Sequence, residues 1–187
     1  MIELIQQAAE LQSFLRERGW RFCIIGGVAI IRWGEPRLTR DVDVSLFAGF
    51  GGEEMIANTL LAEYSARIDG AAEFARVNRV LLLQGKGGIP IDVALAAFPF
   101  EEQMIARATD FEYVPGISLR TASAEDLIVL KAFANRMRDW TDIAGVVAKQ
   151  GSALNWHAIR DRLDPLVLLK GEPEIIESLE RLRLAAP

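Results

Sequence analysis

The sequence reads FCIIGGVA over residues 22–29 and RLTRDVDV over residues 37–44. In the first segment an apolar run ends at two glycines, which is typical of a buried strand followed by a tight turn into a helix. In the second, Asp41 and Asp43 lie two residues apart in a predicted strand, so their side chains point to the same face. Carboxylates held this close repel each other unless a cation lies between them, which indicates a site for Mg²⁺ or Mn²⁺.

A third carboxylate lies in a later predicted strand. In the segment IPIDVAL, residues 89–95, the large apolar side chains alternate onto one face and Asp92 points to the other. The segment GKGG, residues 85–88, predicts a hairpin turn between this strand and another expected at about residues 76–84. Small neighbours around Asp92 would suit a crowded metal site.

Four segments in the same order resemble one family. They are GGVA at residues 26–29, RLTRDVD at 37–43, IPIDVA at 89–94, and EDLIVLK at 125–131 with RDWTDI at 138–143. This pattern resembles the nucleotidyltransferase superfamily with the DNA polymerase beta-like fold, and within it the AbiEii/AbiGii toxin type. The resemblance covers roughly residues 20–145.

The resemblance implies a fold of the α+β class. We expect a mixed sheet flanked by helices, followed by a helical C-terminal half. The first and second predicted strands are joined by a short connection, which favours an antiparallel pair. The predicted domains are a catalytic domain at residues 1–120 and a helical domain at residues 121–187, packed against it.

The chemistry implied by the resemblance is metal-dependent transfer of a nucleoside monophosphate from an NTP to a hydroxyl group. The catalytic residues would be Asp41, Asp43, Asp92 and Lys131, the three aspartates being metal ligands. Asp41 and Asp43 would bridge two ions, while Asp92 would hold the ion that activates the acceptor hydroxyl and would take its proton. Lys131 would bind the triphosphate, although a lysine whose stem crosses an apolar helix surface is a common alternative.

A further set of residues is predicted to bind the nucleotide: Gly26, Gly27, Arg37, Thr39, Arg40 and Asp142. The glycine amides would cradle phosphate, although a glycine pair is more often a plain turn. Arg37 or Arg40 would neutralise the carboxylates when metal is absent, or bind pyrophosphate. Asp142 would orient Lys131 or bind the acceptor, or would simply be an acid at a helix N-terminus.

Composition restricts the classes of protein. The 187 residues are 51% hydrophobic and carry a formal net charge of −5, so the chain is not a broadly basic nucleic-acid coat protein. Its one cysteine, Cys23, cannot form an internal disulfide, which is typical of a reducing compartment. The sequence shows no signal-peptide pattern and no membrane span, and predicts a cytoplasmic protein with no membrane partner.

Two groups of basic residues suggest the acceptor: Arg32, Arg37 and Arg40 precede the acidic doublet, and Lys131, Arg136 and Arg138 follow the third aspartate. If both groups line one cleft, a phosphate-bearing acceptor is favoured, and we expect an RNA 3′ end rather than an aminoglycoside. The alternatives are a small-molecule (antibiotic) nucleotidyltransferase and a non-catalytic protein that binds nucleotide or a partner. The resemblance also implies a separately encoded antitoxin as a partner.

Overall fold

The structure is a computed structural model that describes residues 1–185. The chain divides into two compact units. One contains Met1–Val28 and Leu38–Ala122, and the other contains Ala29–Arg37 and the chain from Ser123 onward. The assignment of a catalytic domain to residues 1–120 and of a helical domain to residues 121–187 stays a prediction.

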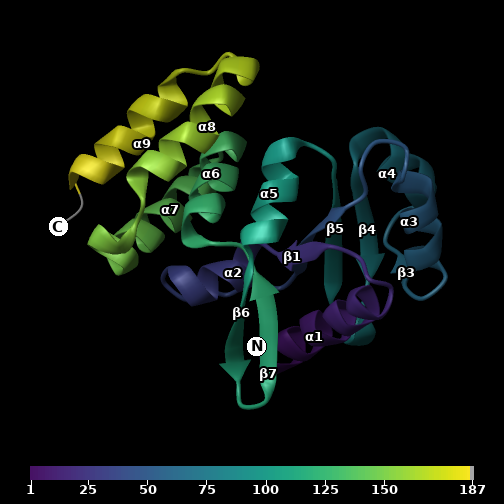
Figure 1. The fold of residues 1–187 in the computed structure, drawn as a ribbon. Helices are drawn as coiled ribbons and strands as arrows, with labels where there is room; N and C mark the ends of the chain where they lie inside the picture. The colour runs from purple at the N-terminus through teal and green to yellow at the C-terminus, as the bar shows by residue number, and fades with distance from the viewer. Residues whose placement is uncertain (186–187) are drawn as a thin grey trace. The chain divides into compact units, whose positions relative to one another are not determined.

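The first unit is built on a seven-stranded mixed sheet (Figure 1). Its strands are β1 (Phe22–Ile24), β2 (Val42–Phe47), β3 (Ser65–Ala66), β4 (Val80–Gln84), β5 (Pro90–Ala96), β6 (Thr109–Val114) and β7 (Ile117–Thr121). The order across the sheet is β3-β4-β5-β2-β1-β7-β6. The pairs β1–β7 and β2–β5 are parallel and the other four are antiparallel, including the predicted β1–β2 pair.

Helices surround this sheet. They are α1 (Ile2–Glu17), the start of α2 (Gly26–Trp33), α3 (Glu53–Leu61), α4 (Ala71–Asn78) and α5 (Pro99–Arg107), with a short 3-10 helix η1 (Lys86–Gly88) in the β4–β5 turn. Helix α1 buries Leu4, Ala8, Leu11 and Leu15, whose spacing of three or four residues places them on one side of the helix. Gly19, with a φ of 66°, follows the end of this helix.

The two faces of the sheet differ in character because residues alternate along each strand. On one face Val42, Val44 and Leu46 of β2 are buried, and they share one apolar core with residues of α1, α3 and α4. The intervening residues of β2, among them Asp43, point to the opposite face. This second face therefore positions the acidic side chains that the sequence analysis singled out.

The second unit is helical. It contains the rest of α2, α6 (Ala124–Ala134), α7 (Met137–Gln150), α8 (Trp156–Lys170) and α9 (Glu174–Ala185), with a short 3-10 helix η2 (Gly151–Ala153). Ser123 caps α6, since its Oγ accepts from the backbone N–H of Asp126 at 3.1 Å. The mixed sheet and the helical C-terminal half confirm the expected α+β class.

One predicted element was wrong. Residues 76–78, expected to begin a strand, belong to α4, and β4 begins only at Val80. Between them Arg79 adopts a left-handed conformation with a φ of 55°, which ends the helix. Buried Ala71 and Ala75, four residues apart, hold α4 against the core, so packing overrides the strand preference of single residues.

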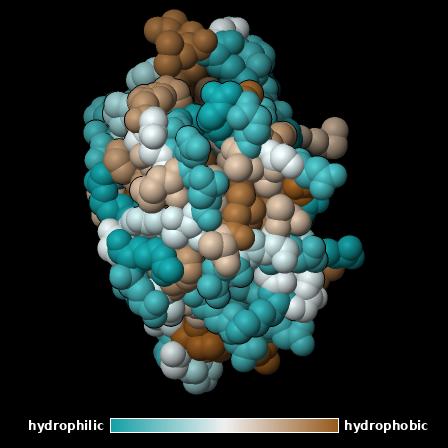
Figure 2. Space-filling model, turned by 90° about the vertical axis from the view of Figure 1, so that its right-hand side faces the viewer, coloured by the Kyte–Doolittle hydropathy of each residue, from teal (hydrophilic) through white to brown (hydrophobic). Residues whose placement is uncertain are grey.

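The surface carries no single apolar expanse in the view of Figure 2, in which hydrophobic residues form separate small groups among hydrophilic ones. Exposed apolar side chains of the helices α3 and α4 include Met55 and Val77. Within residues 1–185, no helix is both long enough and apolar enough to cross a membrane.

Candidate functional site

Two of the three predicted metal ligands lie side by side. Strands β2 and β5 run parallel, and their register places Asp43 directly opposite Asp92. Both residues are partly exposed, whereas the residues on either side of each are buried. Because directly opposed residues of neighbouring strands share a face, the two carboxylates project from the same face of the sheet. The alternative in which Asp92 lies on the far side of the sheet is excluded.

Asp41 lies just before β2, outside the regular strand. The hydroxyl group of Thr39, a buried residue, donates to Asp41 Oδ1 at 2.8 Å and so fixes this carboxylate. Asp41 is also close enough to act on Asp92, since its negative charge contributes to raising the pKa of Asp92. Asp92 is therefore linked to both other aspartates in the first unit, to Asp43 by strand register and to Asp41 by charge.

The two glycines allow a close approach of the backbone to this group. Gly26 has a φ of 59°, and a side-chain carbon there would overlap the carboxylate of Asp43 and lie 2.7 Å from its Cβ. At Gly27 an added carbon would lie 2.6 Å from Thr39 Cβ. The Gly27 N–H donates to Asp43 Oδ2 over a long 3.4 Å. A phosphate bound by this amide, as the sequence predicts, would have to replace that weak hydrogen bond.

The variant Gly26→Ala is expected to lower the free energy of unfolding by about 2–4 kcal/mol, because left-handed strain and the collision with Asp43 add together. Gly19→Ala is the matched control: its φ is 66°, but an added carbon there meets nothing within 4 Å. Strain alone should cost this control about 1–2 kcal/mol. Urea unfolding of both variants measures the difference, and equal losses would contradict the close approach at Gly26.

A cation that the sequence analysis did not single out pairs with one of these acids. Arg67 follows β3 directly, and its Nη2 forms an ion pair with Asp92 Oδ1. Burial raises the pKa of Asp92, the Arg67 guanidinium opposes this effect, and Asp41 adds to it. The net shift is upward, so the charged form of Asp92 is held at a cost that a bound cation would relieve.

The three aspartates fit a hard divalent cation by donor type, and Asp43 and Asp92 also by their shared face. In their present side-chain conformations, however, no three acidic, histidine or cysteine residues among residues 1–185 lie close enough together to hold a metal ion. Thr39, the Gly27 amide and Arg67 each hold one of the carboxylates. Binding of a metal ion would therefore require side-chain rotation and release from these partners, but no change in strand register.

A second cluster of charges lies within the helical unit. Lys131 is only 8% exposed, and its Nζ donates to Asp142 Oδ2 at 2.7 Å and to Asp139 Oδ1 at 3.2 Å. Arg37 binds both oxygens of Asp142, at 2.6 and 2.9 Å. Arg136 binds both oxygens of Asp139, at 2.6 and 3.2 Å. Two buried acids are thus shared among three cations, in an arrangement that we call the Lys131 cluster.

These contacts account for the ionisation of the two acids. Burial alone would raise the pKa of Asp139, but Arg136 and Lys131 outweigh it and hold the pKa below its usual value. For Asp142, Arg37 and Lys131 outweigh burial in the same way. Of the roles weighed for Asp142, orienting Lys131 is the one that this geometry supports.

The predicted residues thus separate into two groups by unit. Gly26, Gly27, Thr39, Asp41, Asp43 and Asp92 belong to the first unit, and Arg37, Lys131 and Asp142 to the second. Arg40 is exposed in the first unit. The sequence analysis missed Arg67 and Asp139. Asp139 lies three residues before Asp142, on the same side of α7, and this spacing is a signal that would have found it.

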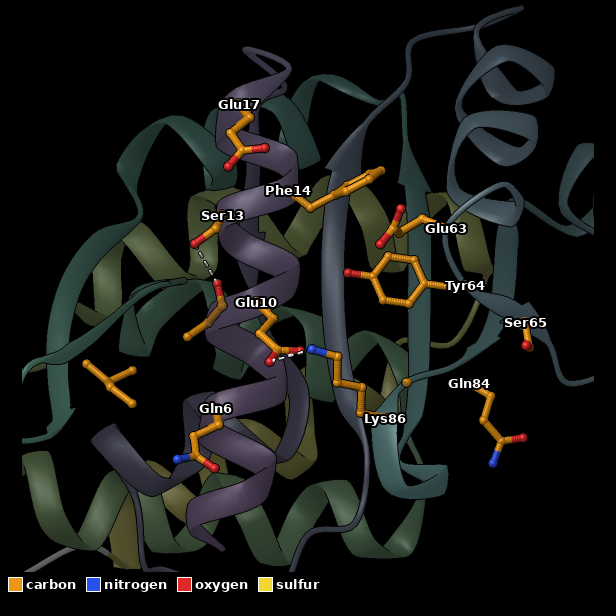
Figure 3. Close-up of a pocket in the computed structure, with 13 residues that line it drawn as sticks. Gln6, Glu10, Ser13, Phe14, Glu17, Glu63, Tyr64, Ser65, Gln84 and Lys86 are labelled. Atoms are coloured by element: carbon orange, nitrogen blue, oxygen red, sulfur yellow. Dashed lines mark hydrogen bonds and ion pairs between the residues drawn. The ribbon is translucent and has the colours of Figure 1, made fainter.

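A hollow of about 880 Å³ lies elsewhere, lined by α1 and by residues 63–65 and 84–86 (Figure 3). The Nζ of Lys86 donates to Glu10 across it at 3.0 Å. Burial, together with Glu63 and Glu10, raises the pKa of Tyr64 to about 12. None of the predicted site residues lines this hollow. The acids on the sheet, which are the predicted metal ligands, therefore remain the candidate site.

Comparison with known protein families shows which superfamily the chain belongs to. The sequence profile of a family described as "Nucleotidyl transferase of unknown function (DUF2204)" matches residues 5–182. The chain belongs to this nucleotidyl transferase family. The match confirms the superfamily indicated by the four segments, and the AbiEii/AbiGii toxin type stays a prediction. No curated protein gives a significant match.

Solved structures share the fold of this nucleotidyl transferase. An antigenic nucleotidyltransferase-like protein from Paracoccidioides brasiliensis superposes with a TM-score of 0.55 at 17% identity, covering 95% of this chain and 92% of its own. The lincosamide antibiotic adenylyltransferase LnuA, solved with lincomycin bound, superposes with a TM-score of 0.51 at 12% identity, covering 75% of this chain and 94% of its own. At these identities the likeness concerns the fold.

Proposed function

We propose that this nucleotidyl transferase moves a nucleoside monophosphate from an NTP to an acceptor hydroxyl, with Mg²⁺ or Mn²⁺ held by Asp41, Asp43 and Asp92. The observation that carries the proposal is the register of Asp43 opposite Asp92 on adjacent parallel strands. Family membership supports the reaction class, because the family is described as a nucleotidyl transferase. The acceptor oxygen would bond to the α-phosphorus, and pyrophosphate would leave with the oxygen that bridges it.

Each residue has a defined part in this proposal. The bound metal would supply positive charge to the phosphoryl oxygens during the displacement. Gly26 keeps the turn free of side-chain atoms beside Asp43, and Thr39 orients Asp41 through its hydroxyl group. Asp92 would take the proton of the acceptor hydroxyl. Lys131, Arg37 and Arg40 stay the cations that the sequence predicts for the triphosphate, and Asp142 binds Lys131 within the helical unit.

Two classes of acceptor are candidates, an RNA 3′ end and a small-molecule hydroxyl. The six basic residues that flank the acidic segments in the sequence favour an RNA 3′ end. Three of them, Arg37, Lys131 and Arg136, bind the acids of the Lys131 cluster, which offsets much of their positive charge. A small-molecule hydroxyl is therefore the second candidate, and the shared fold of LnuA, an antibiotic adenylyltransferase, supports it. A role as a toxin with a separate antitoxin still rests on the sequence resemblance alone.

The test is transfer of label from each of the four NTPs. The whole protein is incubated with α-labelled NTP and Mg²⁺, and with total RNA, an aminoglycoside or a lincosamide. Label in RNA supports the first acceptor class, and label in the antibiotic supports the second. Absence of transfer to any acceptor with every NTP, under both Mg²⁺ and Mn²⁺, would contradict the proposed function.

A further inference from the structure

Arg67 lies in register with the acidic pair. It follows β3 directly, and its backbone N–H donates to the carbonyl oxygen of Leu82 at 3.0 Å, which continues the ladder between β3 and β4 by one residue. Leu82 lies opposite Asp92, and Asp92 lies opposite Asp43. Arg67, Leu82, Asp92 and Asp43 therefore form one row across four neighbouring strands. The guanidinium reaches past Leu82 to the carboxylate of Asp92.

The ion pair between Arg67 and Asp92 is accessible to another cation that could replace the arginine. The side chains are 28% and 35% exposed, so water and ions reach the pair. Within residues 1–185, the Arg67 guanidinium has no second ion-pair partner. A guanidinium stays charged at any physiological pH, so the arginine cannot leave Asp92 by losing a proton. Another cation can displace it.

We propose that Arg67 and a divalent cation compete for Asp92, so that Arg67 weakens metal binding and stabilises the Asp92 carboxylate when metal is absent. The inference rests on the proposed function, because it takes the aspartates as metal ligands. Asp92 Oδ1 is held by the Arg67 guanidinium, and a metal ion at this oxygen would lie beside a second positive charge. Arg67 must therefore release the carboxylate before the metal site is complete.

Competition has a signature that a purely structural arginine lacks. Removing the charge of Arg67 should lower stability in metal-free buffer, since Asp92 then faces Asp41 without this counter-ion. The same change should tighten binding of the metal ion, because its competitor is gone. A purely structural ion pair would give the loss of stability without the gain in affinity.

The experiment measures Mn²⁺ binding to the whole protein without nucleotide, by isothermal titration and by electron paramagnetic resonance. Arg67→Met removes the charge and keeps an apolar stem of similar length. We expect it to bind Mn²⁺ about two- to fivefold more tightly than the wild type, the range given by a partly exposed ion pair. It should also unfold at a lower temperature in EDTA and gain more thermal stability from Mn²⁺.

Arg76→Met is the matched control, because Arg76 is an exposed arginine of the same unit that pairs with Glu73 on its own helix. Its Mn²⁺ affinity should equal that of the wild type. Equal or weaker Mn²⁺ binding by Arg67→Met would overturn the inference while leaving the metal site standing. Failure of both the wild type and Arg67→Met to bind Mn²⁺ would overturn the metal site itself, and the inference with it.

Discussion

An Asp43→Asn variant is expected to transfer nucleotide at least about a thousandfold more slowly than the wild type. Asp43 lies directly opposite Asp92 on the neighbouring strand, and the Gly26 turn packs closely against its side chain. Loss of several kcal/mol of transition-state stabilisation by a metal ion corresponds to this factor. The fold should survive, because an amide has the same shape and still accepts the Gly27 N–H. Initial rates of label transfer at saturating NTP measure the effect.

Asp110→Asn provides the control for charge removal in the same unit. Asp110 lies on β6 at the edge of the sheet, is 52% exposed and pairs with Arg16 rather than with the site. Its transfer rate should stay within about a factor of two of the wild type, in line with the small effects of surface substitutions. Urea transitions of both variants should resemble that of the wild type. An active Asp43→Asn, or an equal loss in Asp110→Asn, would contradict the assigned role.

The sequence carried enough information to bring the acids together. Alternation in β2 and β5 assigned Asp43 and Asp92 to the polar face, and each residue is partly exposed between buried neighbours in the structure. Their exact opposition could not be predicted. It depends on the parallel register of two strands that are separated by more than 40 residues of chain, and no local pattern encodes that register.

Arg67 shows where sequence reasoning fails. Strand β3 has only two residues, both exposed, so it offers no alternation that could reveal it. The contact with Asp92 also depends on the intervening strand β4, whose start was predicted within α4. Without the order of β3, β4 and β5, nothing distinguishes Arg67 from any other surface arginine.

The Lys131 cluster shows a different limit. The sequence predicts that these basic residues bind phosphate, yet Arg136 and Lys131 bind the carboxylate of Asp139. Asp139 and Asp142 lie on the side of α7 that is buried, together with Ile143 and Val146. Local spacing predicts which residues share a helix side, but the partner across from them is set by how helices pack. Charge counts along a sequence therefore overestimate the charge available to a ligand.

The second large effect is expected from Asp142→Asn, which should lower the free energy of unfolding by about 2–3 kcal/mol at pH 7. Asp142 is 5% exposed and bridges Arg37 and Lys131. Removing one charge of a buried ion pair leaves its partners uncompensated and costs about 3–5 kcal/mol. The remaining contact of Lys131 with Asp139, and the partial exposure of Arg37, reduce the expected loss. Urea unfolding at pH 7 measures it.

The pH dependence of this loss distinguishes charge from packing. The ion pairs lower the pKa of Asp142 in the folded protein from its ordinary value of 3.8. The stability that they contribute is therefore complete well above pH 4 and is lost as the pH falls through the lowered pKa. The difference in free energy of unfolding between the wild type and Asp142→Asn should be constant from pH 5 to pH 8 and narrow only below about pH 4.

Asp161→Asn is the control, because Asp161 is 61% exposed and contacts His157. It should lower the free energy of unfolding by less than about 0.5 kcal/mol over the same pH range. A gap that persists unchanged into acid would assign the role of Asp142 to shape rather than charge, and would remove the basis for its orientation of Lys131.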